Sequence, residues 1–230
     1  MDVRVALVSG ANRGIGADIA RHLYQQGWQL SLGMRTPSRP AWDDDGRCHL
    51  FAYDATEGQE PAWVQEAHAR FGRIDALVPC AGLMIPKSVI DAEEDELEAM
   101  MAVNVMAPRR LAKAAWEPLK ASGRGRILLP GSLSGKRVKS ADSGTYALTK
   151  HATVALAHAL RQAGWEHGIR ATAINPGFVN TDMARSITHY PPDQMTDPTA
   201  IAEAVGLLIN LPNTSSVAEF NVNCVLEPMY

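Results

Sequence analysis

Residues 9–16 read Ser9-Gly10-Ala11-Asn12-Arg13-Gly14-Ile15-Gly16 and directly follow a strand-sized apolar run, Val3 to Val8. Ile15, Ile19 and Leu23 recur at four-residue spacing, so a helix is predicted to begin inside this stretch. Glycine allows a tight turn and a close approach of the backbone to a pyrophosphate, while the amino end of a helix supplies amide donors. A strand, a glycine-rich turn and a helix in this order predict a phosphate-binding turn. Its expected ligand-facing residues are Ser9, Gly10, Asn12, Arg13, Gly14, Ile15 and Gly16.

The same alternation of strand and helix continues along the chain. Six more strand-sized apolar runs follow, at Gln29 to Leu32, His49 to Tyr53, Ala76 to Val78, Arg126 to Leu129, Arg170 to Ile174 and Phe220 to Val225. Helical periodicity marks segments between them, at Trp63 to Phe71, Leu97 to Leu119, Tyr146 to Trp165 and Ala200 to Leu211. This pattern predicts one α/β domain over residues 1–230, a doubly wound Rossmann fold with a seven-stranded parallel sheet and helices on both faces.

The composition excludes several classes of protein. With 22 Lys and Arg against 25 Asp and Glu, the net charge is -3, unlike a chain that binds nucleic acid through its phosphates. Three widely spaced cysteines fit neither a disulfide framework nor a Cys-x-x-Cys site, and His151 and His158 have no carboxylate at metal-ligand spacing. No apolar run approaches the roughly 18 residues of a membrane helix, and no signal peptide is visible. We expect a cytoplasmic protein without a metal, membrane or nucleic-acid partner.

The glycine spacing and the end of the second predicted strand bear on the nucleotide that is bound. Gly-x-x-x-Gly-x-Gly is not a P-loop, which would end in Gly-Lys-Ser/Thr, so ATP or GTP hydrolysis is disfavoured. In Rossmann domains an acidic residue near this strand end binds the ribose of NAD, whereas arginine accommodates the 2′-phosphate of NADP. The chain has Gly33-Met34-Arg35-Thr36 there, without a carboxylate. Arg35 together with Arg13 therefore favours NADP(H), and NAD(H) is the alternative.

A second candidate site is Tyr146-Ala147-Leu148-Thr149-Lys150. The spacing of four puts the phenol and the ammonium on one face of a helix. A nearby positive charge favours the phenolate and lowers the pKa of a tyrosine towards the working pH of an acid-base catalyst.

Together these features resemble the short-chain dehydrogenase/reductase family over nearly the whole chain. Residues 9–16 are similar to its Thr-Gly-x-x-x-Gly-x-Gly motif, and Tyr146 with Lys150 is similar to its Tyr-x-x-x-Lys pair. Asn104 and Ser132 match the family's active-site asparagine and serine, and Asp54 its adenine-contacting aspartate. Asn175 to Met183 is similar to the segment that borders the nicotinamide. By the same resemblance, the coenzyme would also contact Ala55, Ala81, Gly82, Pro176, Gly177, Val179 and Thr181.

The resemblance implies hydride transfer between a nicotinamide and a carbonyl or alcohol carbon. Tyr146 would pass the proton, and Lys150 would bind the nicotinamide ribose and lower the pKa of Tyr146. Ser132 would hydrogen-bond the substrate oxygen, and Asn104 would hold a water that links Lys150 to solvent. Ser134 competes with Ser132 for this role, but Ser132 follows the strand at the family's position.

The sequence also departs from the family pattern. Pro79-Cys80-Ala81-Gly82 stands where the family has Asn-Asn-Ala-Gly, so a side-chain amide that ties strands together is lost. The spacing from Ser132 to Tyr146 is one residue longer than is common in the family, an insertion expected in the loop Lys136 to Ser143. The altered Pro79-Cys80 is the best support for an alternative function, an NADP-binding regulator or scaffold with little turnover.

Two regions bear on the substrate and on assembly. A short loop, Met183 to Pro198, is the expected substrate loop and favours a small or medium carbonyl. Lys136, Arg137 and Lys139 are candidates for an anionic substrate, although a solvated basic loop is the favoured interpretation. Residues 92–119 and 146–165 form helices that are apolar on more faces than one sheet contact needs, which predicts a homodimer or homotetramer through them.

Overall fold

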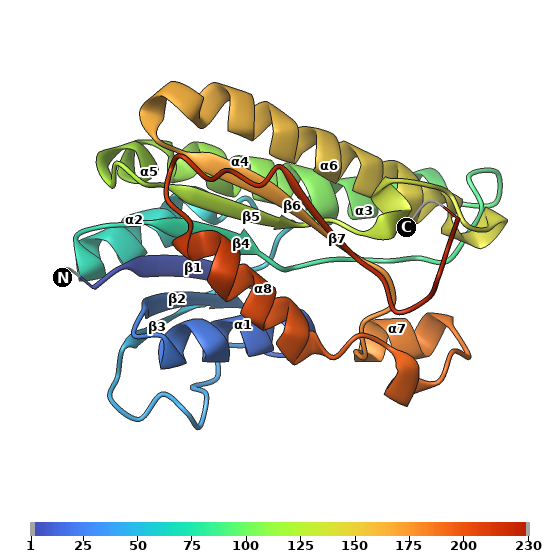
Figure 1. The fold of residues 1–230 in the computed structure, drawn as a ribbon, viewed down its shortest axis with the longest axis horizontal. Coiled ribbons are helices and arrows are strands. Elements are labelled where there is room, and N and C mark those ends of the chain that lie inside the picture. Colours follow the sequence, from blue (N-terminus) through green and yellow to red (C-terminus); the bar gives the residue numbers. More distant parts are fainter. Residues whose placement is uncertain (1–2, 229–230) are drawn as a thin grey trace.

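Seven parallel strands form one sheet in the order β3-β2-β1-β4-β5-β6-β7 (Figure 1). The computed structural model describes residues 3–228. The strands are β1 (Val5–Ser9), β2 (Gln29–Met34), β3 (Cys48–Ala52), β4 (Ala76–Pro79), β5 (Arg126–Pro130), β6 (Arg170–Pro176) and β7 (Glu219–Val222). The order reverses at β1, whose neighbours are β2 and β4, and this is the point where open α/β sheets bind ligands.

Helices cover both faces of the sheet, as Figure 1 shows. One face carries α1 (Gly14–Gln25) and α8 (Pro198–Asn210). The other carries α2 (Glu60–Phe71), α4 (Ala107–Ala114) and α6 (Gly144–Gly164). Ala6 and Val8 pack with the first group of helices, and Val5 and Leu7 with the second. Because successive side chains of a strand point to opposite faces, a strand buried on both sides is apolar throughout, and the predicted doubly wound fold is confirmed.

The predicted helix Leu97 to Leu119 is not continuous. The structure divides it into α3 (Glu94–Met101), a π-helical segment (Ala102–Met106), α4 and α5 (Trp116–Ala121). A π segment inserts an extra residue into the turn and is frequent at functional sites, and this one contains Asn104. Its position inside an unbroken helical periodicity explains why the sequence did not reveal it.

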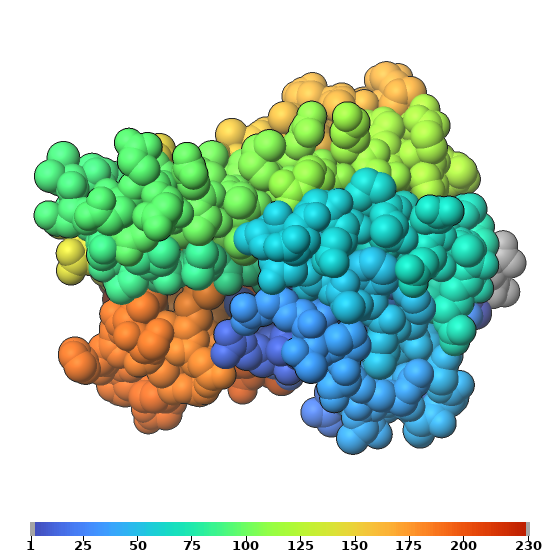
Figure 2. Space-filling model, turned by 180° about the vertical axis from the view of Figure 1, so that it is seen from behind, coloured from blue at the N-terminus to red at the C-terminus, as the bar shows by residue number. Residues whose placement is uncertain are grey.

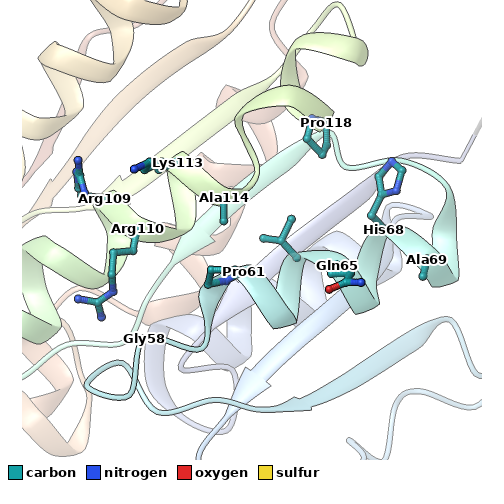
Figure 3. Close-up of a pocket in the computed structure, with 11 residues that line it drawn as sticks. Gly58, Pro61, Gln65, His68, Ala69, Arg109, Arg110, Lys113, Ala114 and Pro118 are labelled. Carbon is teal, nitrogen blue, oxygen red and sulfur yellow. The ribbon is translucent and has the colours of Figure 1, made fainter.

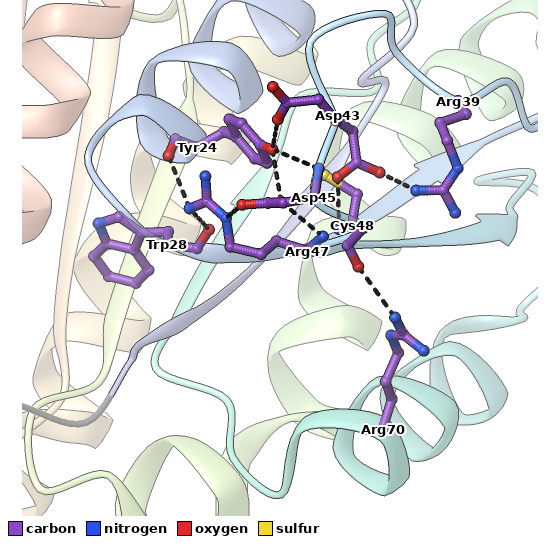
Figure 4. A network of polar contacts seen from close by, with 10 residues as sticks. Tyr24, Trp28, Arg39, Asp43, Asp45, Arg47, Cys48 and Arg70 are labelled. Atoms are coloured by element: carbon purple, nitrogen blue, oxygen red, sulfur yellow. Dashed lines mark hydrogen bonds and ion pairs between the residues drawn. The ribbon is translucent and has the colours of Figure 1, made fainter.

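Residues 37–45 form a loop that is mostly exposed but held to the domain by its aspartates. The Tyr24 hydroxyl of α1 lies 2.7 Å from Oδ1 of both Asp44 and Asp45, which share its one hydrogen, and the Arg47 guanidinium stacks on the Tyr24 ring at 3.8 Å (Figure 4). Asp43 is buried and bonds to Arg39 and to the Cys48 amide. The three aspartates therefore fasten the loop to the body of the domain.

The expected substrate loop Met183 to Pro198 has structure of its own. It includes most of α7 (Asp182–Ile187) and a 3-10 turn, Pro192–Gln194. Val179 forms a parallel bridge to Thr196, which closes the segment on itself. Within residues 3–228, no helix is long and apolar enough to cross a membrane.

Candidate active site

The predicted site residues gather at the carboxyl ends of the central strands. Figure 2 shows a hollow on this side of the molecule between the segment near residue 90 (green) and the segment near residue 185 (orange), beside the glycine-rich turn (dark blue). In a parallel sheet the loops after all strands meet at the same edge, which brings together β1, β4, β5 and β6.

The glycine-rich turn is built for close backbone contact. Gly10 and Gly14 have φ of 63° and 55°, in the left-handed region that favours glycine. A Cβ at Gly16 would lie 2.4 Å from the Gly10 carbonyl oxygen, so a side chain would break the turn. Helix α1 begins at Gly14 and has no side-chain cap, which leaves its first amides for an anion. This cradle fits the pyrophosphate of a dinucleotide.

The altered motif at the end of β4 still contacts this turn. The Ala81 amide donates to Ser9 Oγ at 3.1 Å, and a Cβ at Gly10 would lie 2.9 Å from the Ala81 nitrogen. Proline has no amide hydrogen, and β4 pairs with β5 only through Ala76 and Leu77. The two strands therefore separate before Pro79, in agreement with a lost inter-strand tie.

The residues expected around the adenosine end lie after β1, β2 and β3. Arg35 is exposed and close enough to Asp54 to help lower the pKa of that carboxyl, after the two hydrogen bonds from Thr56. Arg13 forms a long ion pair with Asp182 of α7, 3.8 Å apart and largely exposed, which contributes little stability. Ala55 lies beneath this region, and its carbonyl accepts a bond from Arg110 at 2.6 Å.

Ser132 and Tyr146 come together at the end of β5 and the start of α6. Ser132 bonds to the Tyr146 phenol, and its Oγ also accepts the Ser134 amide at 3.0 Å. The backbone amide of Ser134 thus orients the Ser132 hydroxyl. Burial raises the pKa of Tyr146 above its ordinary value, and the bond from Ser132 opposes this rise. Without a ligand the phenol stays protonated at neutral pH.

Lys150 lies one helical turn further along α6 and is almost fully buried, at 6% exposure. Its Nζ donates to the Pro130 carbonyl at 2.8 Å and lies 5.5 Å from the centre of the Tyr146 ring. Burial lowers the pKa of Lys150 to about 8 and raises that of the neighbouring Cys80 thiol to about 12. The thiol is therefore neutral, and Lys150 carries the local positive charge.

Asn104 joins three elements of the site. Its amide donates to the Leu83 carbonyl at 2.8 Å and to Thr149 Oγ1 at 3.0 Å, and its Oδ1 accepts the Leu83 amide at 2.9 Å. Its own carbonyl accepts Thr153 Oγ1 at 3.1 Å. The side chain thus fixes the loop after β4 against α6. The water-holding role stays a prediction and would use the second lone pair of the carbonyl. Sequence reasoning missed the roles of Thr149, which lies inside the Tyr-x-x-x-Lys stretch, and of Thr153, which follows it by four residues.

The segment after β6 lies next to the glycine-rich turn. The Gly177 amide bonds to the Val222 carbonyl, and Val179 is buried after Pro176. The Thr181 hydroxyl caps α7 by accepting the Ala184 amide at 3.4 Å. Its Cγ2 lies 3.4 Å from the place of a Cβ on Gly14, so this segment and the turn are near neighbours.

The substrate side of the site is lined by aromatic and paired charged groups. Phe178 stacks on Tyr190 at 6.0 Å, and Lys139 lies over the Phe178 ring. Arg137 forms two 2.7 Å bonds with Glu227, and Lys139 also pairs with Glu227. Lys136 pairs with Glu219, which His158 also contacts at 2.8 Å. The basic loop is therefore occupied by carboxylates of the chain, which argues against an anionic substrate.

No group of histidine, cysteine and carboxylate side chains suited to a metal ion occurs among residues 3–228. The site instead combines a dinucleotide cradle with a phenol, a hydroxyl and an ammonium. This set of groups can bind a coenzyme, orient a substrate oxygen and move one proton.

Comparison with known proteins finds matches to a family of dehydrogenases and to reductases and oxidoreductases. The family model described as short chain dehydrogenase matches residues 4–191. Agropine synthesis reductase of Rhizobium rhizogenes is 34% identical over 98% of this chain and 54% of its own length. The chain thus spans about half the length of that relative. Oxidoreductase UcpA of Escherichia coli O157:H7 is 34% identical over 89% of this chain and 81% of its own.

A solved structure shows the same likeness in three dimensions. The alcohol dehydrogenase from Thermococcus sibiricus, complexed with 5-hydroxy-NADP, superposes with a TM-score of 0.85 and 28% identity. The match covers 99% of this chain and all of that one. The similarity therefore extends through the sheet, the helices and the edge that carries the site.

Proposed function

The chain belongs to the short chain dehydrogenase family, and from this membership and its site we propose that it is an NADP(H)-dependent oxidoreductase. Its substrate would be a small or medium carbonyl compound or the matching secondary alcohol. The observation that carries the proposal is the convergence of Ser132, Tyr146 and Lys150 beside the glycine-rich turn. The three free cysteines support a reducing compartment such as the cytoplasm.

The residues of the chain divide the work of the reaction. A bound nicotinamide coenzyme supplies the hydride in reduction and accepts it in oxidation. Ser132 and Tyr146 hold the substrate oxygen by hydrogen bonds and so orient the carbonyl carbon. In reduction Tyr146 Oη gives its proton to that oxygen, and in oxidation it removes the proton.

Lys150 supports this step in two ways. Its ammonium keeps two donors after the bond to Pro130, and these would hold the nicotinamide ribose. Its charge also stabilises the phenolate that Tyr146 becomes once the proton has left. Asn104 keeps α6 and the loop after β4 in place for both residues.

Turnover distinguishes the enzyme from the alternative, a coenzyme-binding scaffold suggested by Pro79-Cys80. NADPH oxidation against a panel of small and medium aldehydes, ketones and 3-oxo acids should be measured with the wild type and with Tyr146→Phe. The proposal predicts turnover that the variant loses. Coenzyme binding without turnover on any panel member favours the scaffold.

The preference for NADP(H) is tested by Arg35→Gln. We expect the variant to raise the KM for NADPH roughly tenfold or more, because a charge-assisted hydrogen bond contributes about 1.5–3 kcal/mol. The KM for NADH should change little, since the 2′-phosphate is absent there. Arg39→Gln is the matched control, because Arg39 pairs with Asp43 away from the turn. A wild type that uses NADH better than NADPH would contradict the preference.

We also propose that the chain forms a dimer through α3 and α4. Asp95 and Glu98 are exposed at one end of this helical face, Arg109 and Lys113 at the other, and Met106 is 42% exposed between them. An antiparallel two-fold pairing would put acidic ends against basic ends, as an isologous interface requires.

Arg109 and Lys113 also line a groove of about 720 Å³ between α2 and α4 (Figure 3). Exposed Leu148, Ala155 and Ala159 on α6 extend the apolar area.

Charge reversal tests this interface. Glu98→Arg and Arg109→Glu should each shift the mass in solution towards the monomer, because like charges would then face each other. The double variant should restore the dimer, since the attraction is reinstated with its polarity exchanged. Light scattering coupled to gel filtration measures the mass. Equal masses for all four proteins would contradict the proposed pairing.

A further inference from the structure

Four arginines gather at the amino ends of the strands, at the edge of the sheet opposite the candidate active site. Arg4 precedes β1, Arg124 precedes β5, Arg126 begins β5 and Arg170 begins β6. Because parallel strands begin at one edge, these side chains meet where α8 ends, on the side of the chain's amino terminus in Figure 1. We call these four residues the arginine cluster.

Three members of the cluster converge on two consecutive residues, Asn210 and Leu211. Arg126, 3% exposed, donates to the Leu211 carbonyl at 2.6 Å. Arg124 donates through Nη2 to the carbonyls of Leu211, at 3.2 Å, and of Asn210. Arg4 donates through Nη2 to Asn210 Oδ1. The guanidinium groups therefore lie side by side around the last residue of α8.

The positive charge of the arginine cluster exceeds the negative charge of the carboxylates around it. Within residues 3–228, no carboxylate forms an ion pair with any of the four arginines. Asp75 acts on Arg4 and Glu166 acts on Arg170 through their charges, but both oxygens of Asp75 bond to Arg73, which adds a further positive charge. Burial and the charges of Arg124, Arg170 and Arg4 lower the pKa of Arg126 to about 10. The carboxyl end of α8 offsets only about half a charge.

Donors for a ligand are left over. The Nε and Nη1 groups of Arg4 and Arg124 make no hydrogen bond to any of residues 3–228. The Arg4 guanidinium stacks on Trp28 at 4.0 Å, and that of Arg170 on Trp165 at 3.7 Å. Arg170 uses its Nε and Nη1 donors on the carbonyls of Asn213, Trp165 and Ile169 and contributes mainly charge. In Arg4, stacking covers the face of the guanidinium and leaves donors on its edge, the geometry that matches tetrahedral oxyanions.

We propose that the arginine cluster binds a phosphate-type oxyanion, at a site separate from the coenzyme site. Such an ion would supply the missing negative charge and take up the free donors of Arg4 and Arg124. The source is either free phosphate or the phosphate group of a small ester. The proposal does not depend on the reaction that the chain catalyses.

Phosphate binding is best measured in the Arg13→Gln/Arg35→Gln variant, where the proposed coenzyme-phosphate contacts are removed. Inorganic phosphate at roughly ten times its Kd for the protein should raise the Tm of this variant by about 3–5 °C, since the ligand binds the folded state. Adding Arg124→Gln should raise the Kd for phosphate at least tenfold, because the free Nε and Nη1 donors of Arg124 and its positive charge are lost. Arg21→Gln, which removes one exposed arginine from α1, is the matched control and should leave the Kd unchanged.

Competing ions complete the test. Sulfate should compete with phosphate, and potassium chloride at matched ionic strength should give no comparable shift. Phenyl phosphate that binds more tightly than phosphate points to an ester ligand, and weaker binding points to the free ion. Equal phosphate affinity in the Arg124→Gln and Arg21→Gln backgrounds, or no phosphate-dependent shift at all, would overturn the proposal.

Discussion

Tyr146→Phe is expected to lower kcat for carbonyl reduction by roughly 10²–10⁴-fold, the range that a positioned general acid contributes. The phenol bonds to Ser132 and lies on the same face of α6 as Lys150, so its proton is placed where a substrate oxygen would be held. Because burial raises the pKa of Tyr146, the group stays protonated at neutral pH and is ready to donate. Steady-state NADPH oxidation measures the loss.

The direction of the reaction gives this prediction a second readout. Oxidation of an alcohol needs the phenolate, so its rate should rise with pH, whereas reduction should be favoured at lower pH. Tyr146→Phe should remove both dependences while it leaves the affinity for NADPH within about twofold, because the lost hydroxyl would face the substrate. Tyr24→Phe is the control, since it removes the same atom from a phenol that bonds to Asp44 and Asp45 far from the site. Equal kcat values in the two variants would refute the assigned role.

The sequence predicted the parts of the site that depend on local patterns. Gly10, Gly14 and Gly16 are recognisable because a backbone that must turn and touch its neighbours tolerates no side chain there. The order of strands and helices also follows from periodicity, since buried parallel strands are apolar on both faces. These features depend on residues that are close together in the sequence.

The remaining features depend on contacts between distant residues. The Asn104 side chain in the π segment bonds to Leu83 and Thr149, which are 21 and 45 residues away, and neither periodicity nor propensity signals a bond across such separations. Asp43 stands in a run of three aspartates, yet it is buried and bonds to Arg39 and to the Cys48 amide. The pairing of Arg137 with Glu227 spans 90 residues and likewise leaves no local trace. Tertiary context, not composition, decides these positions.

Lys150→Met is expected to abolish most turnover and at the same time to stabilise the fold. The ammonium is buried with one hydrogen bond, and its pKa falls to about 8 from an ordinary value near 10.5. That shift means that the folded state holds the proton less tightly than the unfolded state does. After allowance for the lost bond to Pro130, we expect methionine to raise the free energy of unfolding at pH 7 by about 2 kcal/mol. For a domain of this size this corresponds to a Tm increase of roughly 4–8 °C.

The pH dependence separates this electrostatic cause from simple repacking. In the wild type the unfavourable charge is fully present below pH 8 and is relieved as the pH rises from about 8 towards 10.5, where the unfolded state also loses its proton. The advantage of Lys150→Met should therefore be largest near pH 7 and shrink above pH 8, as urea unfolding at several pH values will show. Lys120→Met, at a partly exposed lysine paired with Glu117, should show no such trend. A stabilisation that is constant with pH would mean that methionine only packs better, and the lysine would then carry no electrostatic penalty for the chemistry that it supports.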